Sequence, residues 1–431
     1  MAVPRAERTR QPSANRASPA CPPLPSPAPP SPGVLRGIDP QLAFMPYPTA
    51  HVPHADLGPL AGLSFGVNDV FDVAGYPTSA GNPLMLALSG VRDRTASAVQ
   101  RLLDAGARYA GKTCIDELSF SISGRNTHFG TPVNGAAPGR VPGGASSGSA
   151  SVVSTGLCDF ALVTDTGGSS RVPASHCGLF GLRPTPGRIS LDGCVPLCES
   201  FDTVGCLARD ADVFERAAEV LLGADTRPLP PDPVLWRAAD AFESMDAAVQ
   251  LALRPSTERV QAFLGPARDV RVAHDPDADA LHWAFRHLQG REAWLSTGPF
   301  IERHVPPLGP GVAERFAWAR EISDDQVASA RRLQRSLHRR LGALLRAGAV
   351  LMLPTMPDIA PRLDEEEPSL DLYRHRAVRL LCWASLAGVP QVTLPLARRL
   401  GAPLGLSLIG PAGSDLSLVR LAARICRPEL H

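Results

Sequence analysis

The sequence predicts an α/β fold for most of this 431-residue chain. Short apolar runs bounded by turn residues alternate with amphipathic helical segments, as expected of a sheet covered by helices. Loops rich in glycine and serine follow several of these runs. Hydrophobic residues make up 44% of the chain and charged residues 20%, which is typical of a globular protein of this size with a large core.

The first half of the chain supplies most of the predicted sheet. Its strands are expected at 63–67, 107–110, 160–163 and 179–182, and a helix at 94–103. The helix carries Val99, Leu102 and Leu103 on one face, and Gly106 is placed to end it. The run at 160–163 is apolar throughout, which favours a central strand.

Residues 222–322 have a different character. They contain a proline-rich turn at 227–233 and expected helices near 239–251 and 280–294. We interpret this region as inserted or variable, and as shaping a ligand pocket.

A clear helix then begins at Ser323, which forms a predicted capping box with Gln326. An apolar stripe follows and Gly348 ends it; the stripe consists of Leu333, Leu337, Leu341, Leu344 and Leu345. Strands at 350–353 and 391–394 are expected to return to the same sheet, with Pro395 ending the second.

The N-terminus differs from the rest in composition. Residues 1–37 are rich in proline, serine and arginine, which predicts a disordered tail ahead of one domain at 38–431, with folded sequence from about Leu57. The chain has no apolar run long enough to span a membrane and no secretion signal. Its net charge of +1 gives no reason to expect a nucleic-acid or membrane partner. We therefore expect a cytoplasmic protein.

Nine cysteines without tight spacing argue against a disulfide framework. Cys194 and Cys198 form a C-x3-C pair that could be half of a zinc site. No second pair at zinc-finger spacing accompanies it, so we predict thiols and no metal. Reduced thiols fit the cytoplasm.

Two loops carry the candidate chemistry. One runs from Gly143 to Ala150 and the other from Thr164 to Arg171. Consecutive small residues let several backbone N–H groups converge on one point, as an oxyanion requires. A tight turn or a phosphate-binding loop would also use such residues, but neither loop matches a P-loop or a G-x-G-x-x-G motif.

Together with the segment from Ser175 to Thr185, these loops resemble the amidase signature family. The segments at 111–117, 201–205 and 387–390 also resemble its recurring motifs, and those at 289–294 and 306–311 are most similar to the indole-3-acetamide amidohydrolase branch. The resemblance covers residues 57–428. It implies a mixed β-sheet core flanked by helices, a small amide or amide-like ligand, and no cofactor.

The resemblance also implies a Ser–cis-Ser–Lys triad, whose three positions can be located in this sequence. The nucleophile position is Ser169. Ala145 occupies the position of the bridging serine, and Asn68 that of the lysine base. The implied oxyanion hole consists of the backbone amides of Thr166, Gly167, Gly168 and Ser169, and the implied supporting residues are Ser146, Asp165 and Arg171.

These replacements are chemically severe. Alanine has no proton to relay, and an asparagine amide cannot take up a proton near neutral pH. A serine without a base is a poor nucleophile, and loss of a general base costs about 10²- to 10⁴-fold in rate. The sequence therefore predicts an amidase-like protein that is inactive or strongly impaired.

Alternatives remain open at this point. Lys112, the only lysine, or His128 or His176 could act as an unorthodox base, and Ser146 could replace the bridging hydroxyl. The fold could also serve ligand binding, partner binding or a biosynthetic acyl transfer. The two replacements could have been engineered.

Overall fold

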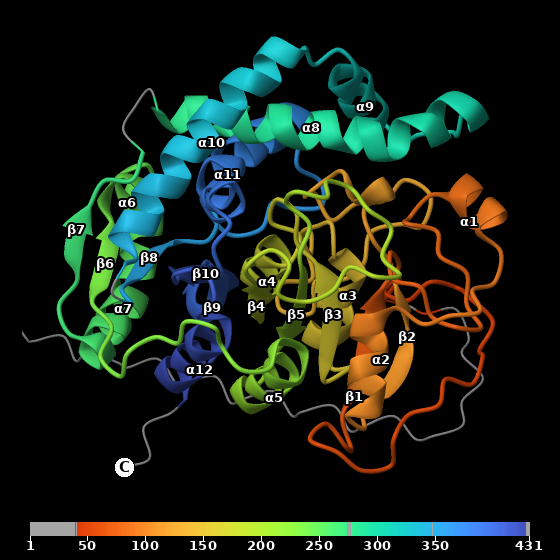
Figure 1. The fold of residues 1–431 in the computed structure, drawn as a ribbon, viewed down its shortest axis with the longest axis horizontal. Coiled ribbons are helices and arrows are strands. Elements are labelled where there is room, and N and C mark those ends of the chain that lie inside the picture. The colour runs from red at the N-terminus through yellow and green to blue at the C-terminus, as the bar shows by residue number, and fades with distance from the viewer. Residues whose placement is uncertain (1–38, 40, 274–276, 347, 428–431) are drawn as a thin grey trace, which may run out of the picture. The chain divides into compact units, whose positions relative to one another are not determined.

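A mixed β-sheet forms the centre of the fold (Figure 1). The computed structural model describes residues 39, 41–273, 277–346 and 348–427, so the predicted tail at 1–37 lies outside the described residues. In this part of the chain the sheet has ten strands in the order β2-β1-β3-β5-β4-β9-β10-β8-β6-β7. The strands are β1 (Ser64–Asn68), β2 (Arg108–Thr113), β3 (Phe160–Thr164), β4 (Phe180–Arg183), β5 (Val204–Ala208), β6 (Leu235–Ala238), β7 (Arg268–Val270), β8 (Val350–Pro354), β9 (Gln391–Arg399) and β10 (Ala402–Ile409).

The sheet is parallel at its two ends and antiparallel in between. Strand β1 pairs in parallel with β2 and β3, and β6 pairs in parallel with β7 and β8. Strands β5, β4, β9 and β10 connect the two parallel ends through antiparallel pairs. The predicted α/β class and the mixed sheet implied by the family resemblance are confirmed.

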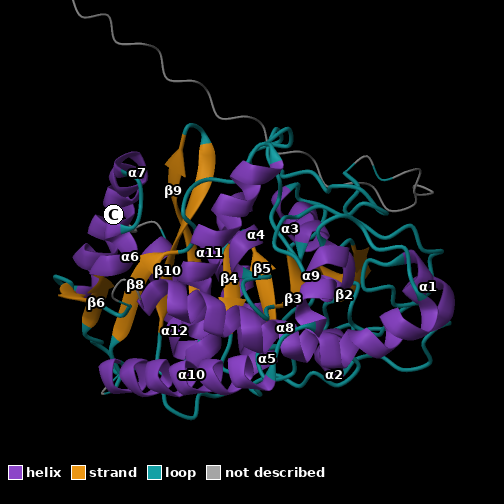
Figure 2. Cartoon of the chain, turned by 90° about the horizontal axis from the view of Figure 1, so that it is seen from above, coloured by secondary structure: helices purple, strands orange, loops and turns teal. Residues whose placement is uncertain are grey.

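Helices cover both faces of the sheet (Figures 1 and 2). They are α1 (Pro83–Ser89), α2 (Ser97–Asp104), α3 (Ser147–Ser154), α4 (Arg171–Cys177), α5 (Ala211–Leu222), α6 (Ala239–Glu243), α7 (Ala247–Leu264), α8 (Asp277–His304), α9 (Val312–Arg320), α10 (Asp324–Leu344), α11 (Glu367–Ala387) and α12 (Asp415–Cys426), with a short 3₁₀ turn at Glu117–Ser119. Helices α3 and α4 pack on one face, and α2, α5 and α12 pack together on the other. Helices α8, α9, α10 and α11 pack against one another as a separate cover.

Burial explains why the central strands are apolar throughout. Every residue of β1, β3 and β5 is buried, because helices cover both faces of the sheet. A strand buried on both faces has apolar residues along its whole length. The stacked rings of Phe65 and Phe160, 5.3 Å apart, lock β1 to β3.

The helix predicted after Ser323 is confirmed as α10. The Ser323 hydroxyl accepts a hydrogen bond from the Gln326 backbone N–H, and the Gln326 side chain accepts one from the Ser323 N–H. Leu337 and Leu341 of the predicted stripe are buried.

The prediction that Pro395 ends a strand is wrong, because β9 continues through it to Arg399. The register between β9 and β10 shifts between Leu404 and Leu406, opposite this proline. A bulge tolerates proline because the bulged residue needs no ladder hydrogen bond.

Residues 222–322 contribute β6 and β7 to the sheet, two strands that the sequence analysis did not predict. One further expectation is corrected by the structure. Folded structure begins before Leu57: Ala43 and Met45 are buried, and the Asp39 carboxylate accepts a hydrogen bond from the Ala43 N–H at 2.8 Å.

Within the described residues, no helix is long and apolar enough to cross a membrane. No group of three or more potential metal-ligating side chains is found in the same part of the chain.

Candidate active site

The site forms where three neighbouring parallel strands end. Asn68 is the last residue of β1, Asp116 follows β2, and Asp165 follows β3. Since the carboxyl ends of parallel strands lie at one edge of a sheet, these polar side chains are gathered there, which is where ligands bind in open α/β sheets.

The loop predicted to form an oxyanion hole runs from Thr166 to Ser169, between β3 and α4. Gly168 has a φ of 133°, a conformation that L side chains rarely adopt. At Gly167 a Cβ atom would lie 2.5 Å from the ring of Phe285 on α8. Both glycines are therefore required by geometry.

The Asp165 side chain holds this loop in place through hydrogen bonds. Its carboxylate accepts hydrogen bonds from the Gly168 N–H at 2.8 Å and the Ser170 hydroxyl at 2.8 Å. Arg171 grips both carboxylate oxygens at 2.9 Å, and Arg183 approaches one of them at 3.0 Å. Burial opposes ionisation of Asp165, but the two guanidinium groups outweigh it and hold its pKa well below the usual range.

A second set of contacts fixes the start of the loop. The Thr166 carbonyl accepts hydrogen bonds from the Ser385 hydroxyl at 2.9 Å and from Arg183 at 3.0 Å. The Thr166 hydroxyl donates to the buried carboxylate of Asp202. The loop is thus held on both sides. The family resemblance implied this role for Asp165 and Arg171, but not for Arg183, Ser385 or Asp202.

Ser169 itself is 5% exposed. Among the described residues its hydroxyl has no hydrogen bond to Asn68, Ser146, Lys112 or His176, and those four side chains bond to other groups. Within the described residues no hydrogen bond therefore links Ser169 to the other two predicted triad positions.

Asn68 and Ala145 are both completely buried, and the Gly144–Ala145 peptide bond is cis. The Asn68 amide donates to the Ser146 hydroxyl at 3.0 Å, and that hydroxyl lies 3.5 Å from the Thr164 carbonyl. Asn68 Oδ1 has no hydrogen-bond partner among the described residues. Ser146 is therefore engaged by Asn68 rather than serving as a relay from a base.

Lys112 is also committed to other contacts. Its ammonium group lies 2.9 Å from the Asp69 carboxylate and donates to the Phe71 carbonyl at 2.5 Å and the Thr78 hydroxyl at 3.2 Å. These contacts direct the ammonium group toward Asp69, Phe71 and Thr78, and none of them involves Ser169.

Neither candidate histidine faces Ser169 as a base. His128 Nε2 pairs with the Glu117 carboxylate at 2.9 Å. His176 Nε2 lies 2.7 Å from the Tyr373 hydroxyl, and Tyr373 donates to the Asp358 carbonyl. Burial, aided by Arg140, lowers the pKa of His176 to about 3.

Asp116 is the residue that sequence reasoning missed. Its N–H donates to the Ala145 carbonyl at 3.0 Å, and its carboxylate lies so close to Gly144 that a Cβ there would be 2.2 Å from Oδ2. The Gly124 N–H donates to Oδ2 at 2.9 Å, whereas Oδ1 has no hydrogen-bond partner among the described residues. Burial raises the pKa of Asp116 to about 6.

Replacing this carboxyl by an amide should stabilise the protein above pH 6. A buried carboxyl whose folded pKa exceeds its unfolded value near 3.8 binds the proton more tightly when folded. Its destabilising effect is absent below pH 3.8, grows as the pH rises, and is complete above pH 6. Asp116→Asn should therefore raise the unfolding midpoint at pH 7.5 and have little effect at pH 4, when both proteins are compared by thermal denaturation. An equal shift at both pH values would contradict the assigned ionisation.

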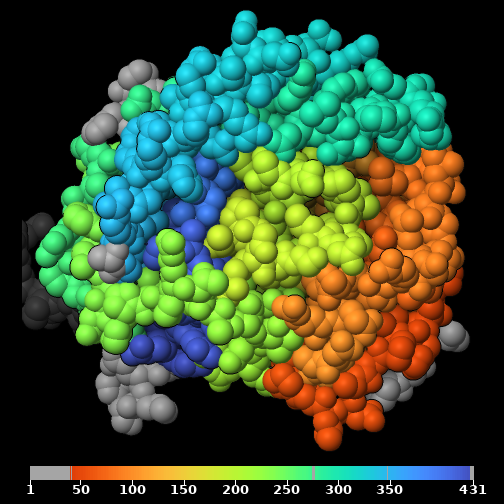
Figure 3. Space-filling model, in the orientation of Figure 1, coloured from red at the N-terminus to blue at the C-terminus, as the bar shows by residue number. Residues whose placement is uncertain are grey.

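Side chains of the cover close over the loop. Phe285 and Gln289 of α8 lie against Gly167, and Leu381 of α11 lies against Gly168. Figure 3 shows the cover, coloured cyan, in direct contact with the yellow-green surface that follows β4.

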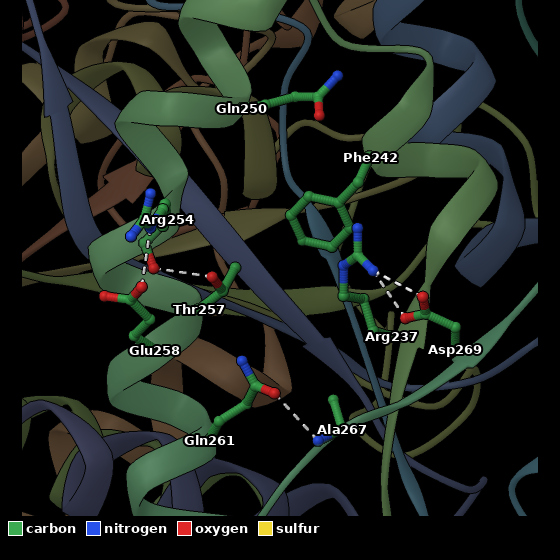
Figure 4. A pocket seen from close by; sticks show the side chains of 9 residues that line it. All are labelled: Arg237, Phe242, Gln250, Arg254, Thr257, Glu258, Gln261, Ala267 and Asp269. Carbon is green, nitrogen blue, oxygen red and sulfur yellow. Dashed lines mark hydrogen bonds and ion pairs between the residues drawn. The ribbon is translucent and has the colours of Figure 1, made fainter.

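A separate cavity of about 560 Å³ lies near the other end of the sheet, between α7 and strands β6 and β7 (Figure 4). Its charged groups are paired: Arg237 with Asp269 at 2.7 Å, and Arg254 with Glu258 at 2.9 Å. None of the predicted triad positions lines it, so it is not the predicted site.

Comparison with known proteins points to one family. Residues 47–256 match the Amidase family model. The chain is 37% identical over 391 residues to Amidase 1 of Arabidopsis thaliana, covering 84% of this chain and 92% of that protein. It is 33% identical to the chloroplastic Outer envelope protein 64 of the same plant, covering 88% of this chain and 68% of that protein.

Solved structures agree. A crystal structure of an amidase superposes with a TM-score of 0.76 at 31% identity, covering 85% of this chain and 84% of that one. The chain is similar to Amidase 1 over nearly the whole length of that protein and shares its fold with a solved amidase, and it belongs to the amidase family.

Proposed function

We propose that this chain is an amidase-family protein that has lost most or all hydrolytic activity and binds a small amide or amide-like ligand. One observation carries the proposal. The positions expected to hold a base and a relay hydroxyl are Asn68 and Ala145, and Asn68 bonds to Ser146 instead of activating Ser169.

Hydrolysis by Ser169 needs a group that removes its proton as it attacks. Lys112, His128 and His176 each bond to another side chain. A braced oxyanion loop alone would leave roughly 10³-fold acceleration over water. Such a residual rate is too small for a working amidase.

Retention of the loop supports ligand binding. The Asp165, Arg171 and Arg183 cluster keeps the glycine loop in place. Because the Gly168 N–H donates to Asp165, the backbone N–H groups proposed to hold a carbonyl oxygen are those of Thr166, Gly167 and Ser169. Phe285 and Leu381 add apolar contacts beside the loop. A carbonyl compound with an apolar body fits these groups.

The test is ammonia release from indole-3-acetamide and a panel of small amides. We expect the protein to give no more ammonia than its Ser169→Ala variant, while binding of at least one amide is detected by calorimetry. Turnover within about tenfold of an ordinary amidase, abolished in Ser169→Ala, would disprove the loss of activity. Binding of no amide would disprove ligand retention.

Asp116 supports a second candidate, a slow hydrolase with an unorthodox base. Its pKa of about 6 and its unpartnered Oδ1 are properties of a general base. In that case any ammonia release should rise through pH 6 and vanish in Asp116→Asn. Release that is independent of pH or unaffected by Asp116→Asn would exclude this candidate.

The proposal also includes a reducing, cytoplasmic setting. The eight cysteines among the described residues are all free thiols, which is consistent with such a compartment. Native expression with a fluorescent tag would test the location.

A further inference from the structure

Helix α10 carries a line of three arginines on its outer surface. Arg332, Arg335 and Arg339 are all exposed. At 3.6 residues per turn they fall within an arc of about 60° and span about 10 Å along the helix axis. Figures 1 and 3 place α10 at the outside of the cover, away from the sheet. We call these three residues the arginine stripe.

The positive charges of the stripe are not paired with carboxylates of the described chain. Within the described residues none of the three arginines forms an ion pair, whereas adjacent arginines of the same helix do: Arg331 with Glu292 at 2.8 Å and Arg340 with Asp277 at 4.0 Å. Acidic residues are not scarce, because the chain holds 42 of them against 43 basic ones.

Like charges spaced three and four residues apart on a helix repel each other. The helix dipole stabilises cations only near the last turn of a helix. Arg332 lies in the middle of α10, so the dipole does not stabilise its charge. The stripe therefore opposes helix stability, and an external anionic partner would relieve that repulsion.

Small residues lie next to the stripe, and the exposed Asp325 falls on the same line one turn beyond Ala328. Ala328 and Ala343 lie on the same line beyond its two ends and are exposed, and Ser336 lies beside it. Small side chains let a second backbone approach closely, while the arginines are long enough to reach past it.

We propose that the arginine stripe docks an acidic helical segment of a partner protein. Carboxylates spaced i, i+3 or i+4, and i+7 on that segment would match the three guanidinium groups, which bind carboxylates in bidentate geometry.

Other anionic partners fit less well. Membrane-binding segments use four to eight basic residues, often beside apolar anchors, but the stripe has three arginines flanked by alanine and serine. Nucleic-acid binding calls for a broad basic surface, and this chain has a net charge of +1. The inference goes beyond the proposed ligand binding and is independent of whether Ser169 is reactive.

The test uses a fluorescein-labelled alanine-rich helical peptide with glutamates at i, i+4 and i+7, and a second peptide of the same composition with the glutamates spread around the helix. We expect the full chain to bind the first at least tenfold more tightly in fluorescence anisotropy, with affinity falling as salt rises. Arg332→Glu/Arg335→Glu/Arg339→Glu should abolish that preference.

The matched control is Arg94→Glu/Arg209→Glu/Arg303→Glu, which makes the same charge change at exposed arginines elsewhere and should leave the preference intact. If the stripe variant does not fold by circular dichroism, the triple change to glutamine takes its place. Equal binding of the two peptides, or equal loss in the control, would overturn the proposal. Tighter binding to phosphatidylserine vesicles or to a 20-base-pair DNA duplex would also overturn it.

Discussion

The double substitution Asn68→Lys with Ala145→Ser should raise amide turnover by about 10³-fold or more over the unmodified protein. It supplies an amine that can accept a proton and a hydroxyl that can relay it to Ser169. Loss of a triad member in a serine hydrolase costs up to about 10⁶-fold in kcat, so regaining two missing members should have a comparably large effect. Ammonia release at pH 8 measures it.

The single substitutions are the controls. Asn68→Lys alone has a base without a relay, and Ala145→Ser alone has a relay without a base, so each should recover far less than the pair. The triple variant that adds Ser169→Ala should be silent. If the double variant folds and binds an amide but stays inactive, the surrounding pocket is not an intact amidase shell.

Asp165→Ala should destabilise the protein by about 3–5 kcal/mol, because it leaves two buried guanidinium groups without their carboxylate. Arg171 and Arg183 are both completely buried and both contact Asp165. Chemical denaturation followed by circular dichroism gives the free energy of unfolding.

Asp364→Ala is the matched control. It removes a carboxylate that pairs with Arg362 at 2.9 Å where both side chains are mostly exposed, so it should leave the free energy of unfolding close to that of the unmodified protein. Equal effects of the two substitutions would mean that the Asp165 cluster does not hold the loop.

Much of the fold could be predicted from the sequence, because its central strands are buried on both faces and their apolar runs are distinctive. The missed strands had weaker signals. Strands β6 and β7 contain exposed or half-exposed arginine and aspartate. Strand β7 is the edge strand of the sheet and β6 is the strand next to it. Strand β9 was cut short because proline usually ends a ladder. The bulge that accommodates Pro395 depends on the register between β9 and β10, which the sequence pattern does not reveal.

The candidate site was predicted only in part, because local sequence patterns mark some of its residues and tertiary contacts define the others. Glycine and serine patterns mark the loop at 166–169, and the family resemblance locates Asn68 and Ala145. Asp116 was missed because its significance depends on burial against Gly144 and on its raised pKa, which are tertiary properties. A usable signal did exist: polar residues end or follow each of β1, β2 and β3, which are parallel neighbours.

The reactivity of the Ser169 hydroxyl shows most directly whether a base acts on it. Labelling with a fluorophosphonate probe, followed by mass spectrometry of the modified peptide, reports this reactivity without requiring knowledge of the natural ligand. We predict negligible modification of Ser169 in the unmodified protein under conditions that label the Asn68→Lys/Ala145→Ser variant within minutes. Rapid labelling of Ser169 in the unmodified protein would show that some group already removes its proton.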